Sequence, residues 1–110
     1  MNPVDTRIIV PADHPSLPGH FPGRPIVPGV VLLDALLDAV RSACDSSLRL
    51  ESIVSAKFLQ AVAPDTPVDV QVRFASETPG RWKARFVARC QGASAVEGSF
   101  LLVSASEGVA

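Results

Sequence analysis

The sequence predicts a single α+β domain, residues 1–110, in which an antiparallel sheet of about five strands wraps around one central helix. The length of 110 residues and the 47% hydrophobic content suffice for one buried core but leave no material for a second. One long helix-compatible run is followed by several alternating segments that are typical of strands. Together these observations favour a helix enclosed by a sheet.

The helix is expected over residues 29–44, GVVLLDALLDAVRSAC. Pro28 suits the first turn, where a missing amide N–H costs nothing. The charged residues Asp34, Asp38 and Arg41 lie along one narrow stripe, and Val, Leu and Ala cover the remainder. A helix that is apolar on nearly all sides is expected to be buried.

The strands are expected mainly after the helix. Residues 68–74 and 82–90 alternate between apolar and polar side chains, and Pro79-Gly80 between them predicts the turn of an antiparallel hairpin. Residues 96–103 predict a further strand, and weaker strands are expected at 7–10 and 53–59. The expected order is one strand, a loop, the helix and about four strands in a meander.

A stiff loop is expected over residues 11–28, which hold six of the ten prolines. Proline fixes φ, lacks an amide donor and biases the preceding residue away from helix. Such a long irregular connection in a small domain is usually functional.

The composition excludes several classes of function. Ten basic against eleven acidic side chains give a formal charge of −1, so nothing indicates nucleic acid or an anionic membrane as partner. The chain start does not resemble a signal peptide, and the longest apolar stretch is too short to span a bilayer, which favours a cytoplasmic protein. Cys44 and Cys90 lack metal-ligand spacing and are interpreted as small core residues.

The most informative segment runs from His20 to Asp34, fourteen residues later. It places an imidazole in the stiff loop and a carboxylate in the helix. Burial of an unpaired carboxylate raises its pKa, which suits a general acid. Periodicity leaves open the alternative that Asp34 and Asp38 face water beside Arg41, and His20 alone could be a loop imidazole bonded to backbone.

Gly29 stands at the expected start of the helix. It could be a plain hinge between the loop and the helix. It could also let a ligand oxygen approach the amide N–H groups and the positive dipole end of the helix. A base, an acid and an oxyanion donor would then lie within one short segment.

The run GHFPGRPIVPGVVLLD resembles the signature of the FabA/FabZ-type 3-hydroxyacyl-acyl carrier protein dehydratases of the hotdog superfamily. The pentapeptide Gly19-His20-Phe21-Pro22-Gly23 and the pair Pro28-Gly29 match without substitution. Asp34 stands where the FabZ type has glutamate and the FabA type aspartate. The similarity covers roughly residues 8–104. The chain is compact and has aspartate at position 34, and in these two respects it is more similar to the ApeI-like dehydratases associated with aryl polyene pigments.

A second segment of the chain is similar to a strand and turn in that family with the sequence pattern KF…PV.PGD. Ala56-Lys57-Phe58-Leu59, Val62 and Pro64 follow the pattern, whereas Ala61, Asp65 and Thr66 replace the usual Pro, Gly and Asp. We interpret this departure as a change in a structural turn that hardly bears on chemistry.

The resemblance implies a hotdog domain that removes water from a 3-hydroxyacyl thioester. His20 would take the proton from carbon 2, the Gly29 amide would hold the thioester oxygen, and Asp34 would bind or protonate the leaving hydroxyl. In these relatives the site lies at a dimer interface, with His of one subunit facing the acid of the other. The reaction needs no metal or organic cofactor, and the glycines lack nucleotide-binding spacing.

The resemblance also implies an acyl chain on phosphopantetheine in an apolar tunnel, for which Phe21, Ile26, Val27 and Val30 are candidate lining residues. Each of them is equally compatible with ordinary core. His14 could approach the tunnel mouth, although an exposed loop position is favoured.

An acyl carrier protein is usually acidic, so a basic patch is expected to receive it. The candidates share strand positions that face away from the apolar side, where the alternative is a solvated outer face. They are Arg73, Arg81, Lys83, Arg85 and Arg89.

Three other functions stay open. A hotdog thioesterase would hydrolyse the thioester, and a silent hotdog subunit would only bind acyl groups. Added isomerase activity is permitted by aspartate at position 34. A homodimer or higher homo-oligomer is expected, with a heterodimer of hotdog subunits as the alternative.

Overall fold

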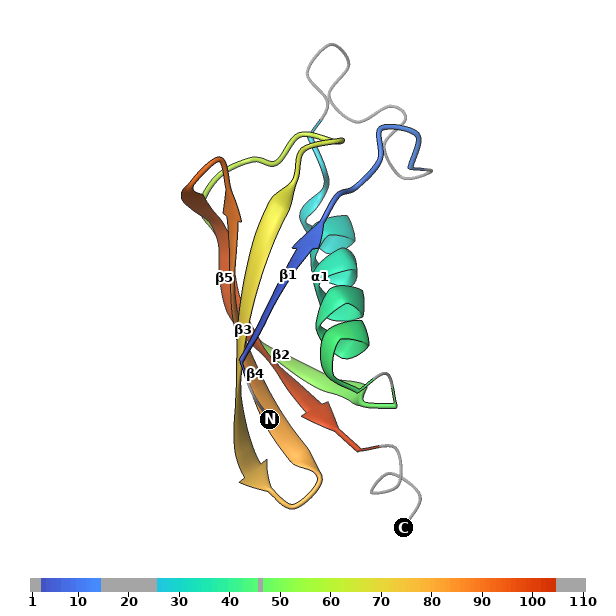
Figure 1. The fold of residues 1–110 in the computed structure, drawn as a ribbon, viewed down its shortest axis with the longest axis vertical. Helices are drawn as coiled ribbons and strands as arrows, with labels where there is room; N and C mark the ends of the chain where they lie inside the picture. Colours follow the sequence, from blue (N-terminus) through green and yellow to red (C-terminus); the bar gives the residue numbers. More distant parts are fainter. Residues whose placement is uncertain (1–2, 15–25, 46, 105–110) are drawn as a thin grey trace.

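The computed structural model describes residues 3–14, 26–45 and 47–104, and it places one helix against one face of a five-stranded antiparallel sheet (Figure 1). The elements in chain order are β1 (Val4–Ile8), α1 (Gly29–Cys44), β2 (Arg49–Phe58), β3 (Val68–Thr78), β4 (Arg81–Cys90) and β5 (Ala93–Val103). The predicted fold class is confirmed.

The strand order in the sheet is β1-β3-β4-β5-β2. Only β3, β4 and β5 form a meander, because β2 pairs with β5 at one edge and β1 pairs with β3 at the other. The expectation of a four-strand meander is therefore wrong. The link from β2 to β3 is too long for a tight hairpin and passes the helix start, where Val27 N–H donates to the carbonyl of Val62 at 2.8 Å.

The helix bounds match the expected 29–44, whereas β2 is longer than the expected 53–59. Its register against β5 shifts between Leu50 and Ser52 and again between Ile53 and Ser55. Each bulge inserts an extra residue and interrupts the alternation of side chains. The period-2 pattern of β2 is consequently visible in only part of its sequence.

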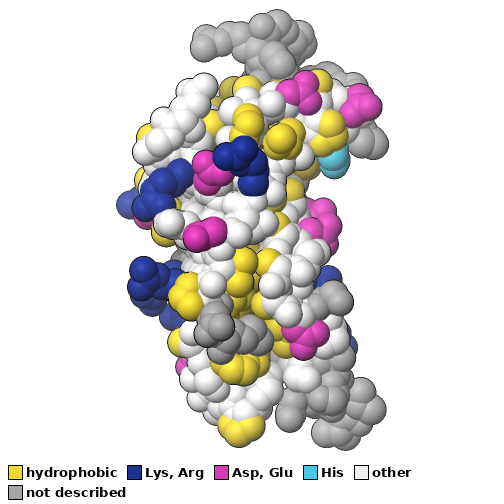
Figure 2. All heavy atoms as spheres, in the orientation of Figure 1, with side chains coloured by type: hydrophobic (Ala, Val, Ile, Leu, Met, Phe, Trp, Pro, Cys, Tyr) yellow, Lys and Arg dark blue, Asp and Glu magenta, His cyan; other side chains and the backbone are white. Residues whose placement is uncertain are grey.

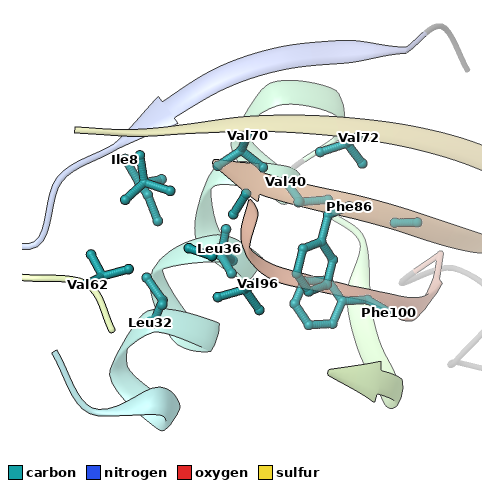
Figure 3. Close-up of a cluster of buried hydrophobic side chains, with 14 of the residues drawn as sticks. Ile8, Leu32, Leu36, Val40, Val62, Val70, Val72, Phe86, Val96 and Phe100 are labelled. Carbon is teal, nitrogen blue, oxygen red and sulfur yellow. The ribbon is translucent and has the colours of Figure 1, made fainter. Parts of the chain in front are cut away.

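The core lies between one stripe of α1 and the inner face of the sheet. Leu32, Leu36 and Val40 point from the helix toward the sheet, where the rings of Phe86 and Phe100 stack with centroids 4.8 Å apart (Figure 3). The spacing of four residues puts the three helix side chains on one face. This stripe and the sheet face together exclude water.

The opposite side of α1 is not covered by the residues that the structure describes. Val30 is 75% exposed, and Asp34 and Asp38 are also exposed. The expectation that the helix is buried on nearly all sides is wrong for the single chain, because one five-stranded sheet covers only one side of a helix.

Both cysteines pack as expected. Cys90 is buried in the core, and Cys44 is partly buried at the end of α1, where its thiol donates to the carbonyl of Val40 at 3.0 Å. Burial raises the pKa of the Cys44 thiol. A raised pKa disfavours the thiolate form that a nucleophilic Cys44 would need.

Candidate active site

A hollow of about 480 Å³ opens at the N-terminal end of α1. Its walls come from the segment before the helix, the first turn of the helix and the segment that leaves β2. The lining residues are Ile26, Val27, Gly29, Leu32, Phe58, Leu59, Gln60, Ala61 and Val62. The walls are mostly apolar, as a site for an acyl chain requires.

Of the predicted tunnel residues, Ile26 and Val27 line this hollow. Val30 does not line it, since it lies on the exposed side of the helix. Phe21 and the predicted base His20 lie outside the described residues. His14 is half-buried and its N–H donates to the carbonyl of Pro11 at 3.1 Å, but it is not among the residues that line the hollow.

Gly29 is the first residue of α1 and forms part of the wall of the hollow. The first bonds inside the helix are donated by the N–H groups of Val31 and Leu32, both to the carbonyl of Pro28 at 3.0 Å. The amide groups at a helix start have no acceptor within the helix and carry its positive dipole end. That end borders the hollow.

Gly29 packs closely against the ring of Phe58. A Cβ atom at position 29 would lie 3.0 Å from Cζ of Phe58, tighter than ordinary van der Waals contact. Phe58 ends β2, so its ring connects the edge strand with the helix start. A larger residue at position 29 therefore needs the Phe58 ring to move by a few tenths of an ångström, and sequence reasoning did not find this contact.

Asp34 lies on the exposed side of α1, with Val30 one turn before it and Asp38 one turn after it. The expectation of a buried carboxylate is wrong for the single chain, which follows the alternative with Asp34 and Asp38 facing water. Two like charges four residues apart repel each other, so helix stability does not explain the pair. In the described part of the chain Asp34 faces water, so a water-excluded site around it requires a further covering surface.

The edge of the sheet formed by β2 is exposed and apolar. All ten residues of β2 are exposed, although the strand pairs with β5 along its length. Large apolar side chains of the strand and of the residue after it are 37–51% exposed, namely Leu50, Ile53, Val54, Phe58 and Leu59. An apolar edge strand is typical of an interface that a second chain covers.

The five predicted carrier-protein residues all lie on β3 and β4 and on the outer face of the sheet. Arg73 and Arg85 are direct register partners. Arg81 is ion-paired with Glu51, and the Arg89 guanidinium donates to Gln71 at 2.5 Å. In Figure 2, Lys and Arg side chains gather along the left edge, on the sheet side of the view.

Only one end of this basic group is distant from the hollow, because Arg89 pairs with Ser94, two residues from Val96, the register partner of Phe58. Arg81 pairs with Val103, which pairs with Arg49 at the start of β2, whereas the hollow lies beyond Phe58 at its end. The length of β2 separates these two levels by roughly 30 Å. The sequence-based candidates for the basic patch did not include Lys57, which precedes Phe58 at the hollow end of β2 and pairs in register with Glu97.

Gln60 is a second lining residue that sequence reasoning missed. Its Nε2 donates to the carbonyl of Ala93 at 3.1 Å and to those of Cys90 and Ser94 at 3.4 Å. The amide therefore fastens one wall of the hollow to the turn between β4 and β5. No motif in the sequence marks this role.

The part of the chain that the structure describes contains no group of three His, Cys, Asp or Glu side chains that could hold a metal ion. No helix in it is long and apolar enough to cross a membrane.

Comparison with known proteins identifies the family. The family model of the ApeI-like dehydratases, described as ApeI dehydratase, matches residues 1–99. The chain belongs to the ApeI-like dehydratase family.

Curated relatives of this ApeI-like chain include FabZ enzymes. The 3-hydroxyacyl-acyl-carrier-protein dehydratase FabZ of Acetivibrio thermocellus is 35% identical over 99 residues, which cover 81% of this chain and 66% of the relative. FabZ of Anaeromyxobacter dehalogenans is 30% identical over 106 residues, covering 87% of this chain and 68% of the relative. The chain thus spans about two thirds of the length of these relatives.

Solved structures share the fold of the ApeI-like chain. The dehydratase heterocomplex ApeI:P from Xenorhabdus doucetiae superposes with a TM-score of 0.71 at 19% identity, covering 92% of this chain and 87% of that one. A variant of the fluoroacetyl-CoA-specific thioesterase FlK gives 0.75 at 13% identity, covering 97% and 89%. At these identities the likeness shows the hotdog fold alone.

Proposed function

We propose that this ApeI-like chain removes water from a 3-hydroxyacyl thioester and gives the trans-2-enoyl thioester, as a hydro-lyase. The observation that carries the proposal is the apolar hollow beside the N-terminal end of α1, with Gly29 in its wall. The family and the GHFPG segment of residues 19–23 support the same reaction. The acyl group would be carried on the phosphopantetheine of an acyl carrier protein.

The proposed mechanism uses protein groups alone. His20 takes the proton from carbon 2, and the electron pair of that bond forms the double bond to carbon 3. The bond between carbon 3 and the hydroxyl breaks, and Asp34 supplies the proton with which the hydroxyl leaves as water. The Gly29 amide donates to the thioester oxygen while negative charge develops on it. Proton transfer from the protonated His20 to the Asp34 carboxylate, through solvent, restores the starting state.

A second hotdog subunit is part of the proposal. Asp34 faces away from the sheet of its own chain, and the β2 edge beside the hollow is exposed and apolar. We propose a homodimer that pairs along β2, with His20 of one subunit facing Asp34 of the other.

The carrier protein is proposed to bind the outer sheet face. Arg73, Lys83 and Arg85 have no ion-pair partner among the described residues, so their charge is available to an acidic partner. Surface charge of this kind mainly accelerates association and makes it sensitive to salt.

The test is mass-spectrometric detection of products from 3-hydroxyacyl thioesters on a carrier protein. The expected product of the wild type is lighter by one water. His20→Ala and Asp34→Asn are expected to lose about a hundredfold or more of the rate, the usual contribution of a general acid or base. Asp38→Asn is the matched control, because Asp38 lies one turn along the same exposed side of α1 and is expected to keep the wild-type rate.

Other products would decide between the alternatives. Release of the free acid would favour a thioesterase function, which FlK performs on a similar fold. Binding without turnover across a broad acyl panel would favour a silent subunit. Migration of the double bond after water loss would add isomerase activity to the proposal.

A further inference from the structure

A groove of about 490 Å³ lies on the outer face of the sheet, across β2, β5 and β4. Lys83 and Arg85 of β4 line it and alternate along the strand with Ala84 and Phe86, which are buried on the inner face. The groove shares no lining residue with the hollow at the helix start. It is therefore a second concave surface, separate from the candidate active site.

Two hydroxyl groups lie in the wall of this groove. Ser99 of β5 is only 4% exposed, and it is the one buried polar residue in the part of the chain that the structure describes. Its Oγ lies 3.3 Å from the Oγ of Ser55, its register partner on β2. Each hydroxyl carries one proton, so the bond between them uses one proton of two. The other proton can be donated to an acceptor in the groove.

Positive charge surrounds the hydroxyl pair. Arg85 lies directly opposite Ser99 on the side away from β2, and Lys83 and Lys57 line the same groove. These three cations have no ion-pair partner among the described residues. Glu97 is the one acidic side chain in the wall, and Lys57 lies directly opposite it and offsets its charge. The groove as a whole is therefore positive.

The charge of Arg85 is also not explained by the stability of the sheet. Arg85 and Arg73 are direct register partners on β4 and β3. Like charges directly opposite each other destabilise a sheet. An anion bound beside Arg85 would offset this repulsion. The placement of these charges thus favours an anionic ligand, as the unused hydroxyl proton does.

We propose that the groove is a binding site for a phosphate group, held by Arg85 and Lys83 and by one hydroxyl of the serine pair. A guanidinium can bind phosphate through two parallel N–H···O bonds, and an ammonium group adds a compact charge. The site lies beyond the proposed function, because its ligand is a phosphate group and not the acidic surface of a carrier protein. Two sources supply this chemistry, a free phosphorylated small molecule and the phosphodiester of a phosphopantetheine arm.

The first experiment uses inorganic phosphate as the probe, titrated into the full chain at constant ionic strength. The NMR amide shifts of Ser55 and Ser99 are expected to move and to saturate. Arg85→Gln is expected to raise the dissociation constant for phosphate at least about tenfold, because a charged, bidentate donor is lost. Ser99→Ala is expected to raise it about threefold, since it removes one neutral donor.

The matched controls lie on β2, outside the groove. Arg49→Gln makes the same change of charge at an exposed position, and Ser52→Ala removes an exposed hydroxyl. Both are expected to keep the wild-type affinity. The proposal is overturned if the shifts of the wild type do not saturate, or if Arg49→Gln weakens binding as much as Arg85→Gln does. Unchanged affinity in Arg85→Gln and Ser99→Ala would overturn it as well.

A second experiment distinguishes the two sources of phosphate. If the arm supplies it, carrier protein with phosphopantetheine is expected to bind more tightly than carrier protein without it, and inorganic phosphate is expected to remove the difference. Equal affinity of the two forms would assign the groove to a free phosphorylated molecule. Dehydration is measured separately. A chain that removes no water would refute the proposed function, whereas the phosphate titration would still decide whether the groove binds.

Discussion

β4 and β2 are both ten-residue strands that pair with β5, one on each side, yet their surroundings are opposite. β4 lies inside the sheet and buries Ala84, Phe86, Ala88 and Cys90. β2 lies at the edge and exposes every residue. The comparison teaches that β4 contributes to the stability of the single chain, whereas β2 presents the exposed surface along which we propose that a second subunit pairs.

The largest expected effect is on β4. Phe86→Ala removes a buried ring that stacks on Phe100. Because less apolar surface is buried and a cavity is left behind, we expect the free energy of unfolding to fall by about 3–5 kcal/mol. Denaturant unfolding measures it. Phe58→Ala on β2 is the counterpart, and a cost as large as that of Phe86→Ala would contradict the division between the two strands.

An intermediate effect is expected where β2 joins the core. A Cβ at Gly98 of β5 would lie 2.3 Å from the backbone oxygen of Ser55 and 3.0 Å from the Phe86 ring. Gly98→Ala must shift β2 and is expected to destabilise the chain by about 1–3 kcal/mol, the usual cost of overpacking. Thermal unfolding measures it, with Ala93→Ser at an exposed position of the same strand as control. An unchanged melting temperature would show that β2 is held loosely.

The smallest effect on folding is expected on β2 itself. Ile53 is 46% exposed, so Ile53→Lys is expected to change the stability of the single chain by no more than about 0.5 kcal/mol. It is nevertheless expected to weaken dimerisation at least about tenfold, because a charge is buried without a partner in the proposed interface. Analytical ultracentrifugation measures the dimer, and Ala75→Lys on exposed β3 is the control of equal charge. An unchanged dimer dissociation constant in Ile53→Lys would show that the dimer interface does not include this part of β2.

The parts of the fold that were predicted correctly depend on local sequence. The bounds of α1 follow from Pro28 and the apolar run after it, and the hairpin turn follows from Pro79-Gly80, where Gly80 has a φ of +77°. The crossing of β2 to the far edge was not predicted, because strand pairing depends on contacts distant in sequence. The two bulges of β2 further conceal its period.

The candidate site was predicted in part. Gly29, Ile26 and Val27 meet at one hollow, as the segment around the second Pro-Gly pair indicated. The exposure of Asp34 was left open by periodicity, because the spacing of charged residues along a helix does not show which side of it the sheet covers. His20 lies outside the described residues, so its pairing with Asp34 stays a prediction. The role of Phe58 depends on contacts across the fold, which no local pattern encodes.

The two register shifts of β2 bear on how the protein avoids aggregation through its edge strand. An unpaired edge strand offers its amide and carbonyl groups to any extended chain, which is the first step of open-ended aggregation. The register shifts after Leu50 and Ile53 bend the strand and interrupt that row of groups. Only a partner strand of matching irregularity can pair along its whole length. We therefore expect this edge to resist open-ended growth, in keeping with the closed dimer that we propose.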